Sequence, residues 1–141
     1  MMKRILIILL IAFMLITGCT TQTQETTLQS TSAESVENAA YIKITAQEAK
    51  EIIDTKENVI VVDVRTAEEY AEGHIPNSML IPGTQIGDLA PDMLPDLDQT
   101  ILVYCRSGNR SAAAAKVLIE MGYTNIMDFG GIKDWPYEIV K

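Results

Sequence analysis

The order of apolar and polar positions divides the chain into an apolar leader, a polar segment and a patterned body. From residue 41 onward, short β-branched runs alternate with helix-like segments. Continuous apolar runs of this length are typical of strands that are buried on both faces of a parallel sheet. The predicted strands cover residues 41–44, 59–64, 79–81, 100–104 and 126–129.

Capping boxes at Thr45 and Thr66 mark the starts of two helices, because each threonine stands three positions before a glutamate. Gly73 is expected to end the second of these helices. A further helix, rich in small residues, is expected before Gly122. The expected helices cover 45–54, 66–72 and 109–121, with at most a short helix within 82–98 and a turn or short helix around 135.

Strands that alternate with helices favour an α/β fold with a small, mainly parallel β-sheet and helices on both of its faces. Right-handed crossovers would bring the carboxyl ends of the strands to one edge, where sites in such folds usually lie. The junction from Tyr104 to Asn109 falls at that edge. The 141 residues allow one ordinary domain, which we place at 41–141.

The first 18 residues predict a signal peptide. Lys3 and Arg4 precede twelve consecutive apolar residues, 5–16, whereas a membrane span needs about 20. Residues 16–19, Ile-Thr-Gly-Cys, resemble the lipobox of bacterial lipoproteins. This resemblance implies lipidation of Cys19 and a lipid anchor on the extracytoplasmic face of the cell membrane, periplasmic or at the cell surface. An uncleaved anchor and a plain secretory signal are the alternatives.

Residues 19–40 are interpreted as the lipidated cysteine and a disordered tether. The 21 residues after Cys19 are rich in Thr, Ser, Gln and Glu and nearly lack large apolar side chains, so they cannot offset the entropy of ordering. As a random coil they would reach roughly 25 Å. The membrane is therefore an expected partner, through the anchor.

Charge and composition narrow the possible partners and cofactors. The net charge is −8, and without residues 1–18 the body has 9 basic and 19 acidic side chains, a net charge of −10. Such a body repels phosphate backbones, so we expect no nucleic-acid partner. One histidine, His74, and two cysteines are too few for a zinc or iron–sulfur site. We expect no metal and no organic cofactor.

The strongest chemical signal is a loop between a predicted strand and a predicted helix, Cys105-Arg106-Ser107-Gly108-Asn109-Arg110. The helix start, the loop amides and two arginines would all place positive charge near one sulfur. Gly108 permits backbone angles that such a loop needs. We therefore expect a lowered pKa for Cys105 and a nucleophilic thiolate. The alternative is an inert cysteine at a strand end.

Four segments in order resemble the rhodanese family of single-domain sulfurtransferases. The loop 105–110 is similar to the family's six-residue active loop, and 63–65, 73–78 and 130–135 are similar to further recurring segments. The resemblance implies the rhodanese-like α/β fold and a Cys105 that cycles between thiolate and persulfide. It also implies the substrate-binding residues Arg106, Ser107, Gly108, Asn109, Arg110 and Arg65.

The implied reaction moves a sulfane sulfur from thiosulfate or a persulfide donor to a thiol or cyanide-type acceptor. The expected partners are a small anionic sulfur donor and a thiol acceptor, and the protein is expected to be a monomer. Asp63 and Arg65 have an alternative role, in which they pair and hold the pocket. His74 is expected to serve structure, and Trp135 to pack in the core or at the rim.

Two other functions stay open. Cysteine phosphatases and arsenate-type enzymes have a similar loop but place five residues between cysteine and arginine, whereas four separate Cys105 from Arg110. A non-catalytic module that displays a thiolate or persulfide to a partner is the second alternative. A dithiol redox cycle is not expected, because there is no CxxC and a lipidated Cys19 would leave Cys105 as the only thiol.

Overall fold

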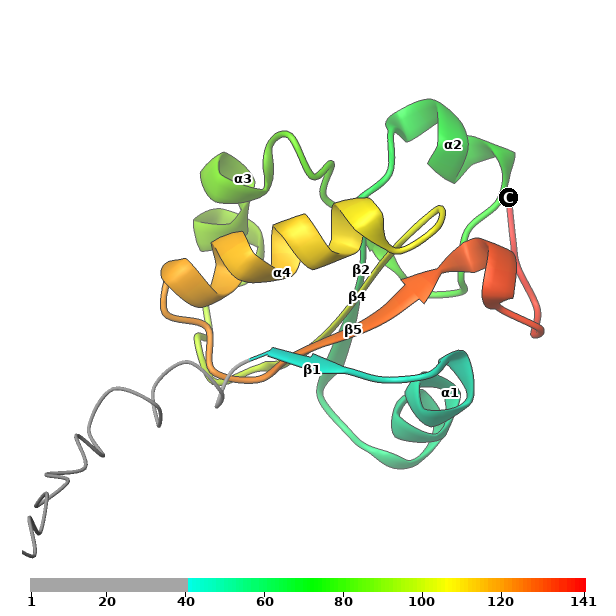
Figure 1. Ribbon diagram of the computed structural model, residues 1–141, viewed down its shortest axis with the longest axis horizontal. Coiled ribbons are helices and arrows are strands. Elements are labelled where there is room, and N and C mark those ends of the chain that lie inside the picture. The colour runs from blue at the N-terminus through cyan, green and yellow to red at the C-terminus, as the bar shows by residue number, and fades with distance from the viewer. Residues whose placement is uncertain (1–40) are drawn as a thin grey trace, which may run out of the picture. The chain divides into compact units, whose positions relative to one another are not determined.

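The computed structural model describes residues 41–141 (Figure 1). The expected signal peptide, the lipidation of Cys19 and the tether lie outside the described residues. Five strands form one sheet in the order β1-β5-β4-β2-β3, and every neighbouring pair is parallel. The strands are β1 Tyr41–Lys43, β2 Val59–Asp63, β3 Met79–Leu80, β4 Thr100–Cys105 and β5 Ile126–Gly131.

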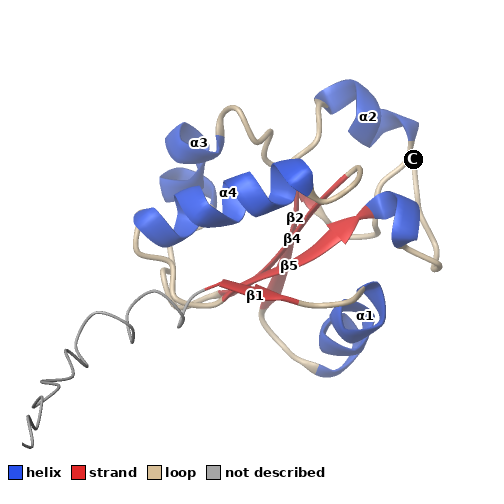
Figure 2. Ribbon diagram, viewed as in Figure 1, coloured by secondary structure: helices blue, strands red, loops and turns tan. Residues whose placement is uncertain are grey.

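Helices cover both faces of the sheet, which confirms the predicted fold class. Figure 2 shows α3 and α4 on one face and α1 on the other. None of the helices within residues 41–141 combines the length and the apolar character that crossing a membrane requires. The helices are α1 Ala46–Thr55, α2 Ala67–Glu72, α3 Ile86–Met93, α4 Asn109–Glu120 and the 3₁₀ helix η1 Ile132–Asp134.

Both predicted capping boxes are present. At the start of α1, the Thr45 hydroxyl accepts from the amide of Glu48 at 3.2 Å, and the Glu48 carboxylate accepts from the amide of Thr45 at 2.7 Å. Thr66 and Glu69 make the same reciprocal pair at 3.3 and 3.1 Å at the start of α2. Local sequence therefore sets where these two helices begin.

Alternation along the central strand β4 decides which face receives the sulfur. Ile101, Val103 and Cys105 belong to the buried cluster beneath α3 and α4. Leu102 and Tyr104 belong to the cluster on the α1 face. Because successive side chains of a strand point to opposite faces, Cys105 lies on the same face as α4.

Strand β5 is longer than the sequence predicts. It continues past Phe129 through two glycines and ends at Gly131. A shift in register lets Gly131 pair with Cys105 at the end of β4. The carboxyl end of β5 is therefore aligned with the start of the cysteine loop.

Candidate active site

Cys105 ends β4, and the loop after it folds back over the sulfur. Cys105 is 1% exposed, and the Gly108 amide donates to its Sγ at 3.1 Å. Gly108 is the N-cap of α4 with φ +98°, a left-handed conformation that other residues rarely adopt. The expected conformational role of Gly108 is confirmed.

The pKa of the Cys105 thiol lies below its ordinary value, as the sequence predicts, although the causes differ in part. Burial raises this pKa, and hydrogen bonding by the backbone and hydroxyl of Ser111 and by the amides of Ser107 and Gly108 outweighs the burial. Donors that point at the sulfur stabilise the charged form. Loop amides and a serine, more than arginine charge, therefore favour the thiolate.

Arg110 is held by an acidic residue from another helix. Its Nη1 donates to Glu69 Oε2 at 2.7 Å and its Nη2 donates to Glu69 Oε1 at 2.8 Å. Hydrogen bonding from Arg110 is the main cause that lowers the pKa of Glu69 to about 2. The carboxylate is therefore ionised across the working pH range and neutralises much of the Arg110 charge. Arg106 is exposed to solvent.

The end of β5 and the cysteine loop approach each other closely. A Cβ placed on Gly131 would lie 2.4 Å from the carbonyl oxygen of Arg106 and 2.7 Å from Cα of Ser107. The Ser111 hydroxyl donates to the carbonyl of Gly108 at 3.0 Å, with Gly130 O at 3.3 Å. Glycine at 131 is therefore a steric requirement of the loop.

Asp63 and Arg65 form a buried ion pair where β2 ends. Arg65 Nη2 and Nε donate to the Asp63 carboxylate at 2.6 and 3.0 Å, and Nη2 also donates to the carbonyl of Gly73 at 2.7 Å. The two residues are 0% and 5% exposed. These contacts support a pair that holds the pocket wall, and the role of Arg65 as a substrate ligand stays a prediction.

His74 and Trp135 make contacts of the structural kind that the sequence predicts. The His74 ring stacks on Tyr70 with centroids 3.7 Å apart, and its Nδ1 lies 3.0 Å from the Tyr70 carbonyl oxygen. Trp135 packs against Phe129 and donates from Nε1 to the carbonyl of Glu138 at 3.2 Å. Trp135 also contributes to a cavity of about 290 Å³ beside Arg65.

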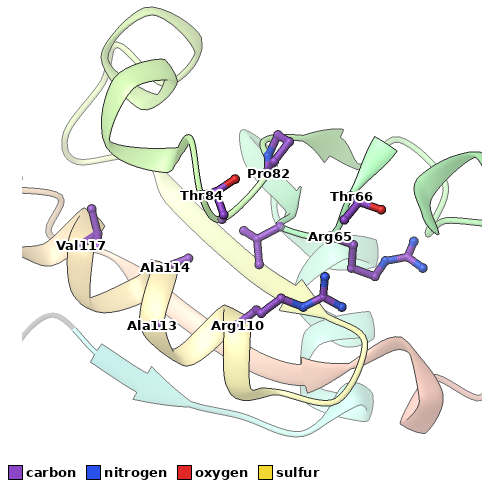
Figure 3. Close-up of a pocket in the computed structure, with 10 residues that line it drawn as sticks. Arg65, Thr66, Pro82, Thr84, Arg110, Ala113, Ala114 and Val117 are labelled. Carbon is purple, nitrogen blue, oxygen red and sulfur yellow. The ribbon is translucent and has the colours of Figure 1, made fainter. Parts of the chain in front are cut away.

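A second cavity, of about 270 Å³, lies between α4 and the segment after β3 (Figure 3). Small and apolar side chains make up most of its wall. Figure 3 shows the Arg110 side chain extending along one end of it towards Arg65. The lining residues are Val64, Arg65, Thr66, Pro82, Gly83, Thr84, Arg110, Ala113, Ala114 and Val117.

Of the predicted loop residues, the structure places the Gly108 amide on the sulfur, whereas the Arg110 guanidinium lies on Glu69. Arg106, Ser107, Asn109 and Arg110 are exposed on the loop or the first turn of α4, and Gly108 is half-buried. Within residues 41–141, no group of three or more His, Cys, Asp or Glu side chains could hold a metal ion. Sequence reasoning missed the part played by Glu69, Ser111 and Gly131.

The sequence indicates Glu69 only as the glutamate of a capping box. Its pairing with Arg110, 41 positions later, has no local sequence pattern that would predict it. Ser111, in the first turn of α4, lies outside the six-residue loop that the sequence singles out. The double glycine after β5 could have indicated the close approach at Gly131, since glycine is the residue that lets two backbones meet.

The site consists of a cysteine at the end of a central parallel strand and the loop that follows it. Together with the sheet, it places the protein among α/β domains that carry a cysteine loop at the carboxyl edge of the sheet. Comparison with known proteins identifies the family. A family model described as "Rhodanese-like domain" matches residues 45–137. The chain therefore belongs to the rhodanese-like domain family, and its relatives include sulfurtransferases.

Several curated relatives are named as thiosulfate sulfurtransferases. One from Escherichia coli is 37% identical over 80 residues, which are 57% of this chain and 77% of the relative. One from Pseudoalteromonas translucida is 32% identical over 97 residues, 68% of this chain and 90% of the relative. A solved structure described as a rhodanese with anions from E. coli is 35% identical with a TM-score of 0.56, over 59% of this chain and 98% of that one.

Proposed function

We propose that the protein is a rhodanese-type sulfurtransferase that carries a sulfane sulfur on Cys105 from thiosulfate or a persulfide donor to a thiol or cyanide-type acceptor. The observation that carries this proposal is the donor contact at the loop sulfur: the Gly108 amide lies 3.1 Å from Sγ. Hydrogen bonding from Ser111 and Ser107 also lowers the pKa of the thiol. The same donors would stabilise the outer sulfur of a persulfide, which carries negative charge.

The reaction has two displacement steps. The Cys105 thiolate attacks the outer sulfur of thiosulfate, a new sulfur–sulfur bond forms, and sulfite leaves with the electron pair of the bond that breaks. An acceptor thiolate or cyanide then attacks the outer sulfur of the enzyme persulfide, and Cys105 leaves as the thiolate. This covalent cycle predicts ping-pong kinetics.

The names of the relatives support this reading over phosphoryl chemistry. Three of them are named as thiosulfate sulfurtransferases, and a related rhodanese was solved with anions. Arg106, Ser107, Gly108, Asn109 and Arg110 are assigned to the donor site because they form the loop and the first turn of α4 that directly follow Cys105, with the Gly108 amide on the sulfur.

The test uses the full chain in detergent, with Cys105→Ser as the control. Both are incubated with thiosulfate and weighed intact, and cyanide is then added while thiocyanate is followed. The proposal expects a gain of one sulfur atom on the wild type alone, discharged by cyanide. Hydrolysis of a phosphotyrosine mimic without sulfur loading would overturn it in favour of a phosphatase. Loading without any turnover would overturn it in favour of a module that only displays the persulfide.

The location is part of the proposal. Cys19 as a lipidated N-terminus would hold the domain, as a monomer, on the extracytoplasmic face of the membrane, where a small anionic donor and a thiol acceptor reach it from solution. Mass analysis of the protein from membrane fractions tests this. A diacylated fragment beginning at Cys19 is expected, and an unmodified Cys19 would refute the anchor.

A further inference from the structure

We infer, building on the proposed sulfur transfer, that the Glu69–Arg110 ion pair and the apolar cavity beside it make a small organic persulfide the preferred sulfur donor over the thiosulfate dianion. The ion pair disfavours a second anion at the mouth of the site, and the cavity receives an apolar carbon group. The ion pair supports the statement about charge, and the cavity independently supports the statement about the carbon group.

The first feature is the charge at the mouth. Arg110 is the arginine of the first turn of α4, and both of its terminal nitrogens donate to Glu69, at 2.7 and 2.8 Å. A dianion that seeks Arg110 must displace a carboxylate that is already bound in bidentate geometry. It must also approach that carboxylate, which repels it. A persulfide has at most one negative charge, so it loses less at this position.

The second feature is the cavity of about 270 Å³ between α4 and the segment after β3. Val64, Pro82, Ala113, Ala114 and Val117 give it an apolar wall. Its volume is slightly below the roughly 300 Å³ at which sites for drug-sized ligands begin, which suits a short alkyl or aryl group. Thiosulfate has no carbon atoms to place there.

One wall of the cavity runs beside the end of β4. Val64, which lines the cavity, donates from its amide to the carbonyl of Tyr104, the residue before Cys105, at 3.0 Å. Cys105 itself does not line the cavity, but it packs in the same buried cluster as Val64 and Ala114. Arg110, which lines one end of the cavity (Figure 3), also follows the loop that encloses Sγ. An organic group seated there would therefore place a sulfur–sulfur bond near the Cys105 thiolate.

The loading step balances without any other reactant. The Cys105 thiolate attacks the outer sulfur of the organic persulfide and forms a sulfur–sulfur bond. The original sulfur–sulfur bond breaks, and the organic thiolate leaves with its electron pair and takes a proton from water. The outer sulfur, with its proton if it carries one, stays on Cys105.

The experiment measures how fast the full chain in detergent is loaded with one sulfur, by quenched intact mass. The donors are thiosulfate and n-propyl persulfide generated in situ, and Cys105→Ser supplies the background. We expect wild type to be loaded at least about tenfold faster by the persulfide, the size of effect that like-charge juxtaposition produces at a binding site. A faster rate with thiosulfate would overturn the inference.

Glu69→Gln tests the ion pair, because glutamine keeps the capping box of α2 but removes the charge. Thiosulfate loading is expected to rise about tenfold and persulfide loading about threefold or less. The matched control is Glu68→Gln, an exposed residue of the same helix. It removes the same charge and is expected to change either rate by about twofold or less. Equal effects of the two variants would overturn this half.

Ala113→Leu tests the cavity. Ala113 lines it from the exposed side of α4, and leucine there would fill part of the space. Loading by propyl persulfide is expected to fall about tenfold, as expected when a ligand loses an apolar contact surface, while loading by thiosulfate reports that the loop is intact. Ala71→Leu, the same change on exposed α2, is the control. An unchanged persulfide rate in Ala113→Leu would overturn the cavity.

Failure of the proposed function gives a different result. If neither donor loads the wild type, the sulfurtransferase proposal itself is wrong. If both donors load the wild type but the loading rates do not change in Glu69→Gln and Ala113→Leu, only the proposed donor preference is wrong.

Discussion

Among single glycine-to-alanine substitutions, Gly131→Ala is expected to disturb the loop 105–110 the most. The new Cβ would stand 2.4 Å from the Arg106 carbonyl oxygen, 2.8 Å from the Arg106 carbonyl carbon and 2.7 Å from Cα of Ser107. All three are backbone atoms, so no side chain can rotate away. An ordinary contact of about 3.4 Å requires the loop and the end of β5 to separate by about 1 Å.

The structure resists that separation. Gly131 pairs with Cys105 in the sheet, and the carbonyl of Arg106 also accepts from the amide of Lys133 at 3.4 Å. Moving the loop lengthens the hydrogen bond from Gly108 to the sulfur. Overpacking of this kind costs about 1–3 kcal/mol of stability. A displacement of 1 Å at reacting groups costs about 100-fold in rate.

The assay combines urea unfolding with sulfur loading from thiosulfate. Gly131→Ala is expected to lower the free energy of unfolding by about 1–3 kcal/mol and the loading rate by about 100-fold. The pKa of Cys105 is expected to rise, because a lengthened amide hydrogen bond supports the thiolate less well.

Two other glycines separate overlap from the general effects of alanine. A Cβ on Gly130 meets nothing within 4 Å, although its φ of +87° is strained for alanine. A Cβ on Gly87 in α3 meets only Val117 Cγ1 at 3.9 Å. Gly130→Ala is expected to cost about 1–2 kcal/mol with a smaller loss of rate, and Gly87→Ala to stabilise by about 0.5–1 kcal/mol. Wild-type loading in Gly131→Ala would refute the reasoning.

Three further predictions concern groups that support the loop and the sheet beneath it. Asp63→Ala leaves the buried Arg65 without its carboxylate and is expected to lower the free energy of unfolding in urea by about 3–5 kcal/mol. Lys50→Ala removes an exposed ion pair and is expected to lower it by about 0.5 kcal/mol or less. Similar losses of stability in the two variants would contradict the role of the buried pair. Ser111→Ala removes a group that lowers the pKa of Cys105, so the midpoint of the pH profile for alkylation by iodoacetamide is expected to move upward, towards the ordinary value of about 8.5. The thiolate is present above its pKa and is lost as pH falls through it, so this variant is expected to react more slowly than wild type near neutral pH, and an unmoved midpoint would contradict the role of the serine. The Ile75 amide donates to the Tyr104 hydroxyl at 3.1 Å, and Tyr104→Phe leaves this amide without that partner. The variant is expected to lose about 1–3 kcal/mol of stability in urea unfolding. An unchanged stability would contradict this account.

Most of the fold could be predicted from the sequence because its signals are local. The capping boxes at Thr45 and Thr66 are made by residues three positions apart. The β-branched run of β2 and the apolar run of β4 are buried as the pattern predicts. The last strand was predicted too short, because β-propensity argues against two glycines, and pairing of Gly131 with Cys105 extends it.

In the candidate site, too, the residues with local sequence signals could be predicted, and the contacts between distant residues could not. Cys105 and the left-handed Gly108 follow from the order strand, loop, helix, which the sequence displays directly. Pairing of Arg110 with Glu69 does not, because it needs α2 to lie beside the first turn of α4, which only the folded chain determines. Sequence reasoning therefore assigned the Arg110 charge to the sulfur, whereas in the structure much of it is neutralised by a carboxylate.

This distribution of charge separates two tasks that the sequence had assigned to the same arginines. The thiolate is favoured by hydrogen bonding from Ser111 and from the amides of Ser107 and Gly108. Because these donors do not depend on Arg110, its pairing with Glu69 leaves the nucleophile activated. The approaching donor then meets the Glu69–Arg110 ion pair instead of a free arginine charge. Arg110 and Cys105 interact coulombically, so Glu69→Gln is expected to lower the pKa of Cys105 slightly while it changes which donor reacts. A pH profile of alkylation on Glu69→Gln whose midpoint lies above that of the wild type would refute this separation of tasks.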